Sequence, residues 1–128
     1  MIVCTSREKD FLTSFSDGAH EALSDTTTEH GGAGAGFSPH DLLCAALGNC
    51  IAITTRIYAK KHDILLEGVT VTVTLNRDDP ARAVFAYSME YKGDIDDKTR
   101  EKLVRVAGAC PVHKTLHREL VFQQASLP

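Results

Sequence analysis

The chain has 128 residues, a length that predicts one domain with one modest hydrophobic core. Hydrophobic residues make up 43% and charged residues 24%, which indicates a soluble globular protein rather than a disordered one. A net charge of −3, no Trp and no basic stretch argue against nucleic-acid binding. The longest apolar run, Leu42 to Leu47, is too short to span a bilayer, so we expect no membrane contact.

The first residues lack a basic region followed by an apolar run, so we expect no signal peptide and a cytoplasmic protein. Thiols stay reduced in that compartment, and a disulfide there is usually catalytic or redox-sensing. The four cysteines form no CxxC pair, which argues against a zinc ribbon or a thioredoxin motif. They are Cys4, Cys44, Cys50 and Cys110.

Residues 1–26 are predicted to form short strands. Asp10 to Phe15 and Ala19 to Ser24 flank Asp17-Gly18, a strong hairpin turn. Such a hairpin is marginal alone and needs further strands, from this chain or from a partner. The Gly-rich segment 26–36 that follows predicts a flexible loop without the pattern of a phosphate-binding loop.

A long helix is predicted from Ser38, a good N-cap followed by Pro39, to about Lys61. Residues at three-four spacing predict its inward face: Leu43, Leu47, Cys50, Thr54 and Ile57. The segment 42–47 is apolar on nearly all sides, which indicates a subunit interface in so small a domain.

In the second half of the chain, the spacing of apolar residues is first that of strands and then that of helices. Residues 69–74 and 84–91 predict two strands joined by a turn. Asp96 to Ala107 predicts an amphipathic helix with Leu103, Val104 and Ala107 inside. Pro111 begins a short helix, and Leu120 to Gln124 predicts a last strand.

Two of the cysteines stand in helix contexts that favour thiol chemistry. Cys110 precedes Pro111 at a helix start, where the helix dipole, His113 and Lys114 are expected to favour its thiolate. Cys50 gains little from the dipole of its own helix and needs a cation from elsewhere, such as Arg56 or a residue of a second subunit. The alternative is that both are packed core thiols, as we expect for Cys4 and Cys44.

Zinc binding is a rival chemistry for the same region. Soft ligands for it are available in Cys50, Cys110, His113 and His40, but they lack the compact pairing of a structural zinc site. We therefore expect no metal site here.

The run from Ser38-Pro39 to Cys50, together with Ala109-Cys110-Pro111-Val112, resembles the OsmC/Ohr family of bacterial thiol peroxidases, in its OsmC-like branch. The resemblance covers essentially the whole chain. It implies an α+β fold in which antiparallel sheets wrap around long central helices of an intertwined homodimer. One OsmC-like domain, 1–128, then divides into strands and Gly-rich loop (1–37), central helix (38–62), strand pair (63–92), helices (93–118) and C-terminal strand (119–128).

The resemblance also implies roles for the two thiols. Cys50 corresponds to the peroxidatic cysteine and Cys110 to the resolving one, with a hydroperoxide as substrate, a dithiol, in some members a lipoyl group, as reductant, and no cofactor. Characterised peroxidases of the family carry a Glu ten residues before the first Cys, paired with an Arg. Here that position is His40, with Asp41 beside it, and no matching Arg motif is present.

The sequence thus predicts a Cys-based hydroperoxide reductase with a function in the oxidative stress response. His40, His113 and Lys114 are the candidate supporting residues. Two alternatives stay open: a module that binds an apolar ligand, with the thiols lining its pocket, and a redox sensor that forms the disulfide without efficient turnover.

Overall fold

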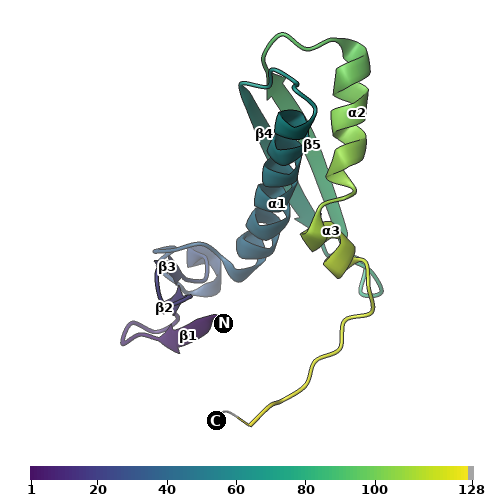
Figure 1. Ribbon diagram of the computed structural model, residues 1–128. Helices are drawn as coiled ribbons and strands as arrows, with labels where there is room; N and C mark the ends of the chain where they lie inside the picture. The colour runs from purple at the N-terminus through teal and green to yellow at the C-terminus, as the bar shows by residue number, and fades with distance from the viewer. Residues whose placement is uncertain (127–128) are drawn as a thin grey trace. The chain divides into compact units, whose positions relative to one another are not determined.

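The computed structural model describes residues 1–126, which form two compact units, Met1–Ala45 and Ala46–Pro128. The helix α1 (Pro39–Lys61) begins in the first unit and continues through the second. The elements combine antiparallel sheets with one long helix and two shorter ones, which confirms the predicted α+β class (Figure 1).

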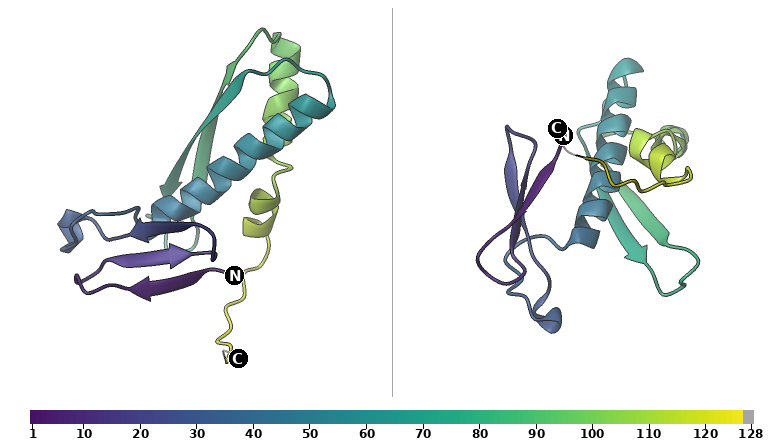
Figure 2. Two further views of the ribbon diagram at one scale, coloured as in Figure 1. Left: turned by 60° about the vertical axis from the view of Figure 1, so that its left-hand side comes forward. Right: turned by 90° about the horizontal axis from the view of Figure 1, so that it is seen from below.

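The first unit contains a three-stranded antiparallel sheet in the order β1 (Val3–Ser6), β2 (Thr13–Ser16) and β3 (Glu21–Ser24) (Figure 2). The predicted hairpin is present, although both of its strands are shorter than expected. Phe15 pairs with Ala22, and Ser16 with Glu21, so the register centres between Gly18 and Ala19 and residues 17–20 form the turn.

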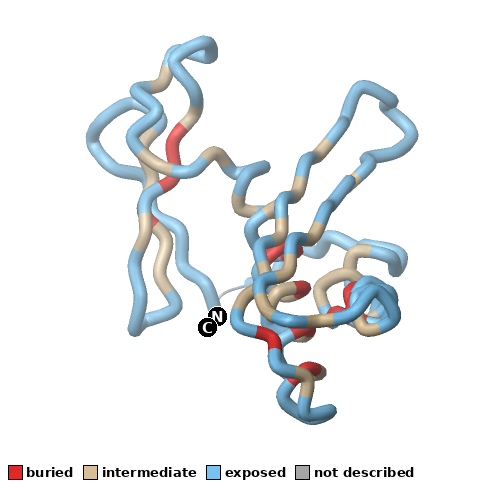
Figure 3. The backbone as a smooth tube through the Cα atoms, turned by 90° about the horizontal axis from the view of Figure 1, so that it is seen from above, coloured by how far each residue is buried: buried red, intermediate tan, exposed pale blue. Residues whose placement is uncertain are grey.

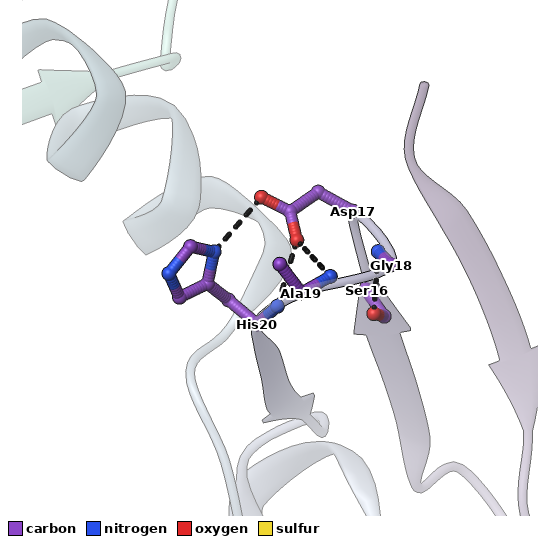
Figure 4. Close-up of polar contacts among 5 residues, drawn as sticks. All are labelled: Ser16, Asp17, Gly18, Ala19 and His20. Carbon is purple, nitrogen blue, oxygen red and sulfur yellow. Dashed lines mark hydrogen bonds and ion pairs between the residues drawn. The ribbon is translucent and has the colours of Figure 1, made fainter.

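Asp17 organises the turn between β2 and β3 (Figure 4). One of its carboxylate oxygens accepts the backbone N–H groups of Ala19 and His20 at 2.8 and 2.7 Å, and the other lies 3.0 Å from His20 Nδ1. The His20 side chain first, and then these N–H groups, lower the pKa of Asp17 to about 2. The carboxylate therefore supports the turn above its ordinary pKa of 3.8, and this support is lost as pH falls through about 2.

The Gly-rich segment is built around Asp25, which is 5% exposed. Its carboxylate accepts backbone N–H groups from Thr26, Ala33 and Ala35, so the loop folds back on one buried anion. Gly36 has no room for a side chain, because a Cβ there would overlap the carbonyl of Leu23. This segment is thus an ordered loop that contains a short 3-10 turn, Thr28–His30.

The second unit packs helices on one face of a strand pair. β4 (Gly68–Asn76) and β5 (Val84–Lys92) are antiparallel, and α2 (Asp97–Ala107) and α3 (Pro111–Leu116) follow them. Alternation along both strands turns one set of apolar side chains toward the helices: Val69, Val71, Val73, Phe85, Met89 and Tyr91. The strands therefore form as predicted, with one half-buried and one exposed face.

The buried side of α1 differs from the predicted one. It consists of Leu47, Gly48, Ile51, Thr55 and Ala59. Only Leu47 of the expected set is buried, while Leu43 and Ile57 are 44% and 61% exposed. Gly48 allows the helix to approach the sheet closely, since a Cβ there would lie 3.2 Å from Val73 Cγ2. In α2, Leu103 and Ala107 are buried as predicted, but Val104 is 53% exposed, because only one side of this helix meets the unit.

α1 is the most apolar helix of the chain. Its 18-residue window has a mean hydropathy of 1.4, enough by length and composition to cross a membrane, although the core helix of a soluble protein meets the same test. The apolar part of α1 is longer than the run 42–47, because it continues through Ile51, Ile53 and Ile57. Its buried residues pack in the second unit against the strand pair, which is the position of a core helix.

The predicted C-terminal strand is not formed. Residues 119–126 have no helix or strand, and residues 127–128 of the predicted 119–128 segment lie outside the described residues. Val121 and Phe122 are 69% and 91% exposed. A strand requires a neighbour with free backbone groups, and none pairs with this segment among residues 1–126.

Candidate active site

Cys50 and Cys110 lie together in the second unit, although sixty residues separate them in the sequence. Cys50 is half-buried on α1, and Cys110 is fully buried as the N-cap residue of α3. Both belong to the cluster around Leu47 and Ile51, and each thiol influences the pKa of the other. The two cysteines form no disulfide in this structure, and they lie close together.

The first turn of α3 supplies backbone donors to both sulfurs. The N–H groups of a first helical turn have no acceptor within the helix. Here the Val112 N–H donates to Cys50 Sγ at 3.5 Å, and the His113 N–H donates to Cys110 Sγ at 3.4 Å. Pro111 occupies the first helical position, where the missing N–H costs nothing. The sequence Cys-Pro-Val-His thus places one donor on each thiol.

The two thiols differ in acidity, and the difference is opposite to the predicted one. Burial raises the pKa of Cys50, but hydrogen bonds from Cys110, the Val112 N–H and Thr54 outweigh it, and the net effect lowers this pKa. Burial raises the pKa of Cys110, and its hydrogen bond to Cys50 raises it further. The start of α3 does favour the Cys110 thiolate, because the His113 N–H donates to Cys110 Sγ, but burial and the neighbouring Cys50 outweigh this donor and the net pKa of Cys110 is raised.

Thr54, one turn after Cys50, offers a test of this arrangement. We expect Thr54→Val, which removes the hydroxyl and keeps the shape, to raise the pKa of the Cys50 thiol and slow its alkylation near neutral pH several-fold. The rate of iodoacetamide labelling at Cys50, followed by mass spectrometry from pH 5 to 10, measures this. Thr54→Ser should keep the wild-type profile, and an unchanged profile in Thr54→Val would contradict the role of the hydroxyl.

A mostly apolar pocket of about 500 Å³ borders the cysteine cluster. Leu47 and Phe85 belong both to the pocket wall and to the cluster that holds the two thiols. The remaining lining residues come from β5, the segment before it, and the region of α3: Ala83, Val84, Tyr87, His113, Leu116, His117 and Leu120. The volume is that of a small-molecule site.

His117 is a lining residue that the sequence reasoning missed. Its ring stacks on that of His113, with ring centroids 5.8 Å apart and an interplanar angle of 13°. The spacing His113-x-x-x-His117, one helical turn, is the pattern in the sequence that identifies this pair.

The other two candidate supporting residues are exposed. Lys114 is exposed on α3, and His40 is exposed in the first turn of α1, within the other compact unit. Arg56, a candidate cation for Cys50, donates from Nη1 to the Leu66 carbonyl at 2.7 Å. Within this chain, the groups that lower the pKa of Cys50 are the Cys110 thiol, the Val112 N–H and the Thr54 side chain.

Within residues 1–126, no three His, Cys, Asp or Glu side chains gather as a metal site. The four residues weighed as zinc ligands, Cys50, Cys110, His113 and His40, thus form no such cluster. The geometry at Cys50 and Cys110 fits two-electron thiol chemistry, in which an acidified thiol and a second thiol stand in contact.

Comparison with known proteins gives a consistent match. A family model described as OsmC-like protein matches residues 31–124. A crystal structure of an osmotic stress induced and detoxification response protein from Psychrobacter arcticus is 30% identical, with a TM-score of 0.77 over 91% of this chain and 87% of that one. No curated protein sequence matches the chain.

Two further solved structures share the fold at lower identity. The OsmC like protein from Mycoplasma pneumoniae is 21% identical, with a TM-score of 0.77 over 91% of this chain and 85% of that one. The organic hydroperoxide resistance protein OhrB of Bacillus subtilis is 18% identical, with a TM-score of 0.66 over 91% and 89%.

Proposed function

The chain belongs to the OsmC-like protein family, and we propose that it is a thiol peroxidase that reduces organic hydroperoxides, with Cys50 as peroxidatic and Cys110 as resolving cysteine. The observation that carries the proposal is the proximity of the two thiols: the Val112 N–H donates to Cys50 Sγ, the net pKa of Cys50 is lowered, and that of Cys110 is raised. A nucleophile with a lowered pKa beside a less acidic second thiol is the arrangement that this chemistry needs.

The reaction proceeds in two steps at this pair. The Cys50 thiolate attacks the distal peroxide oxygen, the O–O bond breaks, the alkoxide takes up a proton and leaves as alcohol, and Cys50 becomes a sulfenic acid. Cys110 then attacks the Cys50 sulfur, a disulfide forms and water leaves. An external dithiol restores both thiols by exchange and is itself oxidised to a disulfide.

The neighbouring pocket supports an organic rather than an inorganic peroxide. It reaches the cysteine cluster at Leu47 and Phe85 and offers mostly apolar walls for a hydrocarbon group. A solved structure that shares the fold is named an organic hydroperoxide resistance protein, which agrees with this substrate class.

The Glu–Arg pair of the characterised peroxidases has no counterpart here, and His40 stands at the Glu position. We infer that the Val112 N–H, the Cys110 thiol and the Thr54 hydroxyl perform its activating function at Cys50. His40 remains a candidate for a polar role near the substrate, with His113 and Lys114 as further candidates around α3.

Peroxide consumption by the prereduced protein with dithiothreitol as reductant tests the function. Cumene hydroperoxide and hydrogen peroxide are compared at equal concentration, with reductant-only and protein-only controls. We expect faster turnover of the organic peroxide. A disulfide that forms without turnover would favour the redox sensor, and free thiols after peroxide treatment would favour the ligand-binding module.

We further propose that the protein acts in the cytoplasm as a homodimer in which each chain forms one OsmC-like domain. All buried apolar side chains of the described residues lie between Leu47 and Cys110, whereas the buried residues of the first unit are Ser14, Ser24 and Asp25 (Figure 3). The first unit leaves Phe11, Leu23 and Phe37 exposed. A sheet without a core of its own requires cover, and a second copy supplies it.

We expect light scattering coupled to size-exclusion chromatography to report twice the mass of one chain at micromolar concentration. Because the proposed contact is apolar, the double variant Phe11→Glu/Phe37→Glu should shift the mass to that of a monomer. The variant Lys9→Glu/Arg77→Glu, at exposed charged positions, serves as the control. A monomeric wild-type protein would contradict the dimer.

A further inference from the structure

A second groove near the thiols lies between α1 and α2, and it is cationic. Its volume is about 610 Å³, and it is open to solvent. Figure 2 shows the two helices side by side, and Ala59 and Leu103 pack between them. Lys61 from α1 and Lys102 and Arg105 from α2 line the groove, and no Asp or Glu does.

The three cations are free of ion pairs among residues 1–126. Lys102 contributes to the lowered pKa of Asp96, whose carboxylate accepts the Thr99 N–H as the N-cap of α2. Glu101 stands one turn before Arg105 and does not pair with it among those residues. In a chain with a net charge of −3, this groove is a local excess of positive charge.

The groove borders residues that flank the two thiols. Thr54, one turn after Cys50 on α1, lines it, and the Thr54 hydroxyl contributes to the lowered pKa of Cys50. Ala109 lines it as well, directly before Cys110 in the chain. Cys110 is fully buried and Cys50 is half-buried, so Cys50 is the more exposed of the two cysteines.

We propose that the groove between α1 and α2 docks an acidic polypeptide that carries the reducing dithiol. The inference rests on the proposed peroxidase function and names the class of its reductant. A shallow, solvent-open groove with three exposed cations suits the surface of a macromolecule, which it attracts through long-range charge. The pocket beside Leu47, which is less open to solvent than the groove, remains available for the peroxide.

Two thiol–disulfide exchanges with the partner return the protein to its reduced form. A thiolate of the partner attacks the Cys50 sulfur of the Cys50–Cys110 disulfide, and Cys110 leaves as a thiolate that takes up a proton. The second partner thiol, as its thiolate, attacks the partner sulfur of the mixed disulfide and releases Cys50 as a thiolate. The partner ends as a disulfide, and two electrons have passed to this protein.

Two synthetic peptides test the proposal. Both carry the same Cys-Gly-Pro-Cys dithiol, flanked in one by four Glu and in the other by four Gln. With the oxidised protein at low salt, we expect the Glu peptide to reduce the disulfide about tenfold faster at subsaturating concentration, and the preference to vanish near 0.5 M salt. The triple variant Lys61→Glu/Lys102→Glu/Arg105→Glu should lose this preference.

A matched variant separates groove charge from net charge. Lys9→Glu/Arg77→Glu/Lys92→Glu makes the same change in net charge at exposed positions outside the groove and should retain the preference. Equal rates for both peptides with the wild-type protein would overturn the proposal, as would the same loss in both triple variants.

A binding measurement keeps this outcome distinct from the fate of the peroxidase. Fluorescence anisotropy of the labelled Glu peptide, with serine in place of both its cysteines, reports docking on the reduced protein without any turnover. Binding that the groove variant loses and the matched variant keeps would support the groove even if no peroxide were consumed. Peroxide turnover with dithiothreitol but no binding of this peptide would overturn the groove and leave the peroxidase intact.

Discussion

Replacement of Cys50 by serine should reduce peroxide turnover by at least ~10³-fold, because the reaction then lacks its nucleophile. Cys110→Ser should behave differently. Its Cys50 still attacks the peroxide, but no neighbouring thiol condenses with the sulfenic acid. One equivalent of peroxide is then consumed quickly, and mass spectrometry after dimedone labelling should find the adduct on Cys50.

The remaining cysteines serve as controls in the same chain. Cys4 is exposed and Cys44 is partly exposed, and both lie in the first compact unit. Cys4→Ser and Cys44→Ser should keep turnover close to that of the wild type. Full turnover by Cys50→Ser would contradict the proposed mechanism, and a dimedone adduct on Cys110 in the wild type would reverse the two roles.

Much of the fold could be predicted from local sequence patterns. Ser38 Oγ accepts the Asp41 N–H at the start of α1, and Asp96 caps α2 in the same manner, so both helices begin where capping residues predict. The alternation of valine and threonine in 69–74 predicts β4, whose valines turn toward the helices. These features depend on residues close together in the chain, which is why they can be recognised in one sequence.

The misjudged features depend on contacts that no local pattern contains. The buried stripe of α1 is rotated from the predicted one, since Gly48 brings the helix against Val73 and turns Ile51 and Thr55 inward. The segment 120–124 has a strand-like sequence but no partner strand among the described residues. In both cases the deciding interaction is tertiary.

The relative acidity of the two thiols also depends on tertiary contacts. The sequence identified Cys50 and Cys110 as the reactive residues to examine, because each stands in a recognisable helix context. Which thiol becomes more acidic depends on how far each is buried and on which groups surround its sulfur, and both follow only from the packing of α3 against α1. The N-terminus of a helix stabilises an anion toward which its free N–H groups point, and the spacing of residues in the sequence does not show where they point.

Neighbouring positions on α2 provide a sharp test of the packing. Leu103 is fully buried in the cluster with Ala59 and Leu66, whereas Val104 is 53% exposed, although the helical pattern predicted both inside. We expect Leu103→Ala to destabilise the protein by roughly 2–5 kcal/mol, because it removes buried methyl groups and leaves a cavity. Val104→Ala, at the adjacent exposed position, should change stability by less than about 0.5 kcal/mol.

Urea denaturation followed by circular dichroism measures both variants at one protein concentration, since any self-association makes stability depend on it. Leu103→Ala should lower the urea midpoint with an unchanged slope, which reports lost packing rather than a different folded state. The melting temperature should fall by on the order of 10 °C. Equal losses for Leu103→Ala and Val104→Ala would mean that the outer face of α2 is covered in solution. Truncation of an exposed valine lowers the free energy of unfolding only slightly. A large loss at Val104 would therefore indicate a contact that a single chain does not contain.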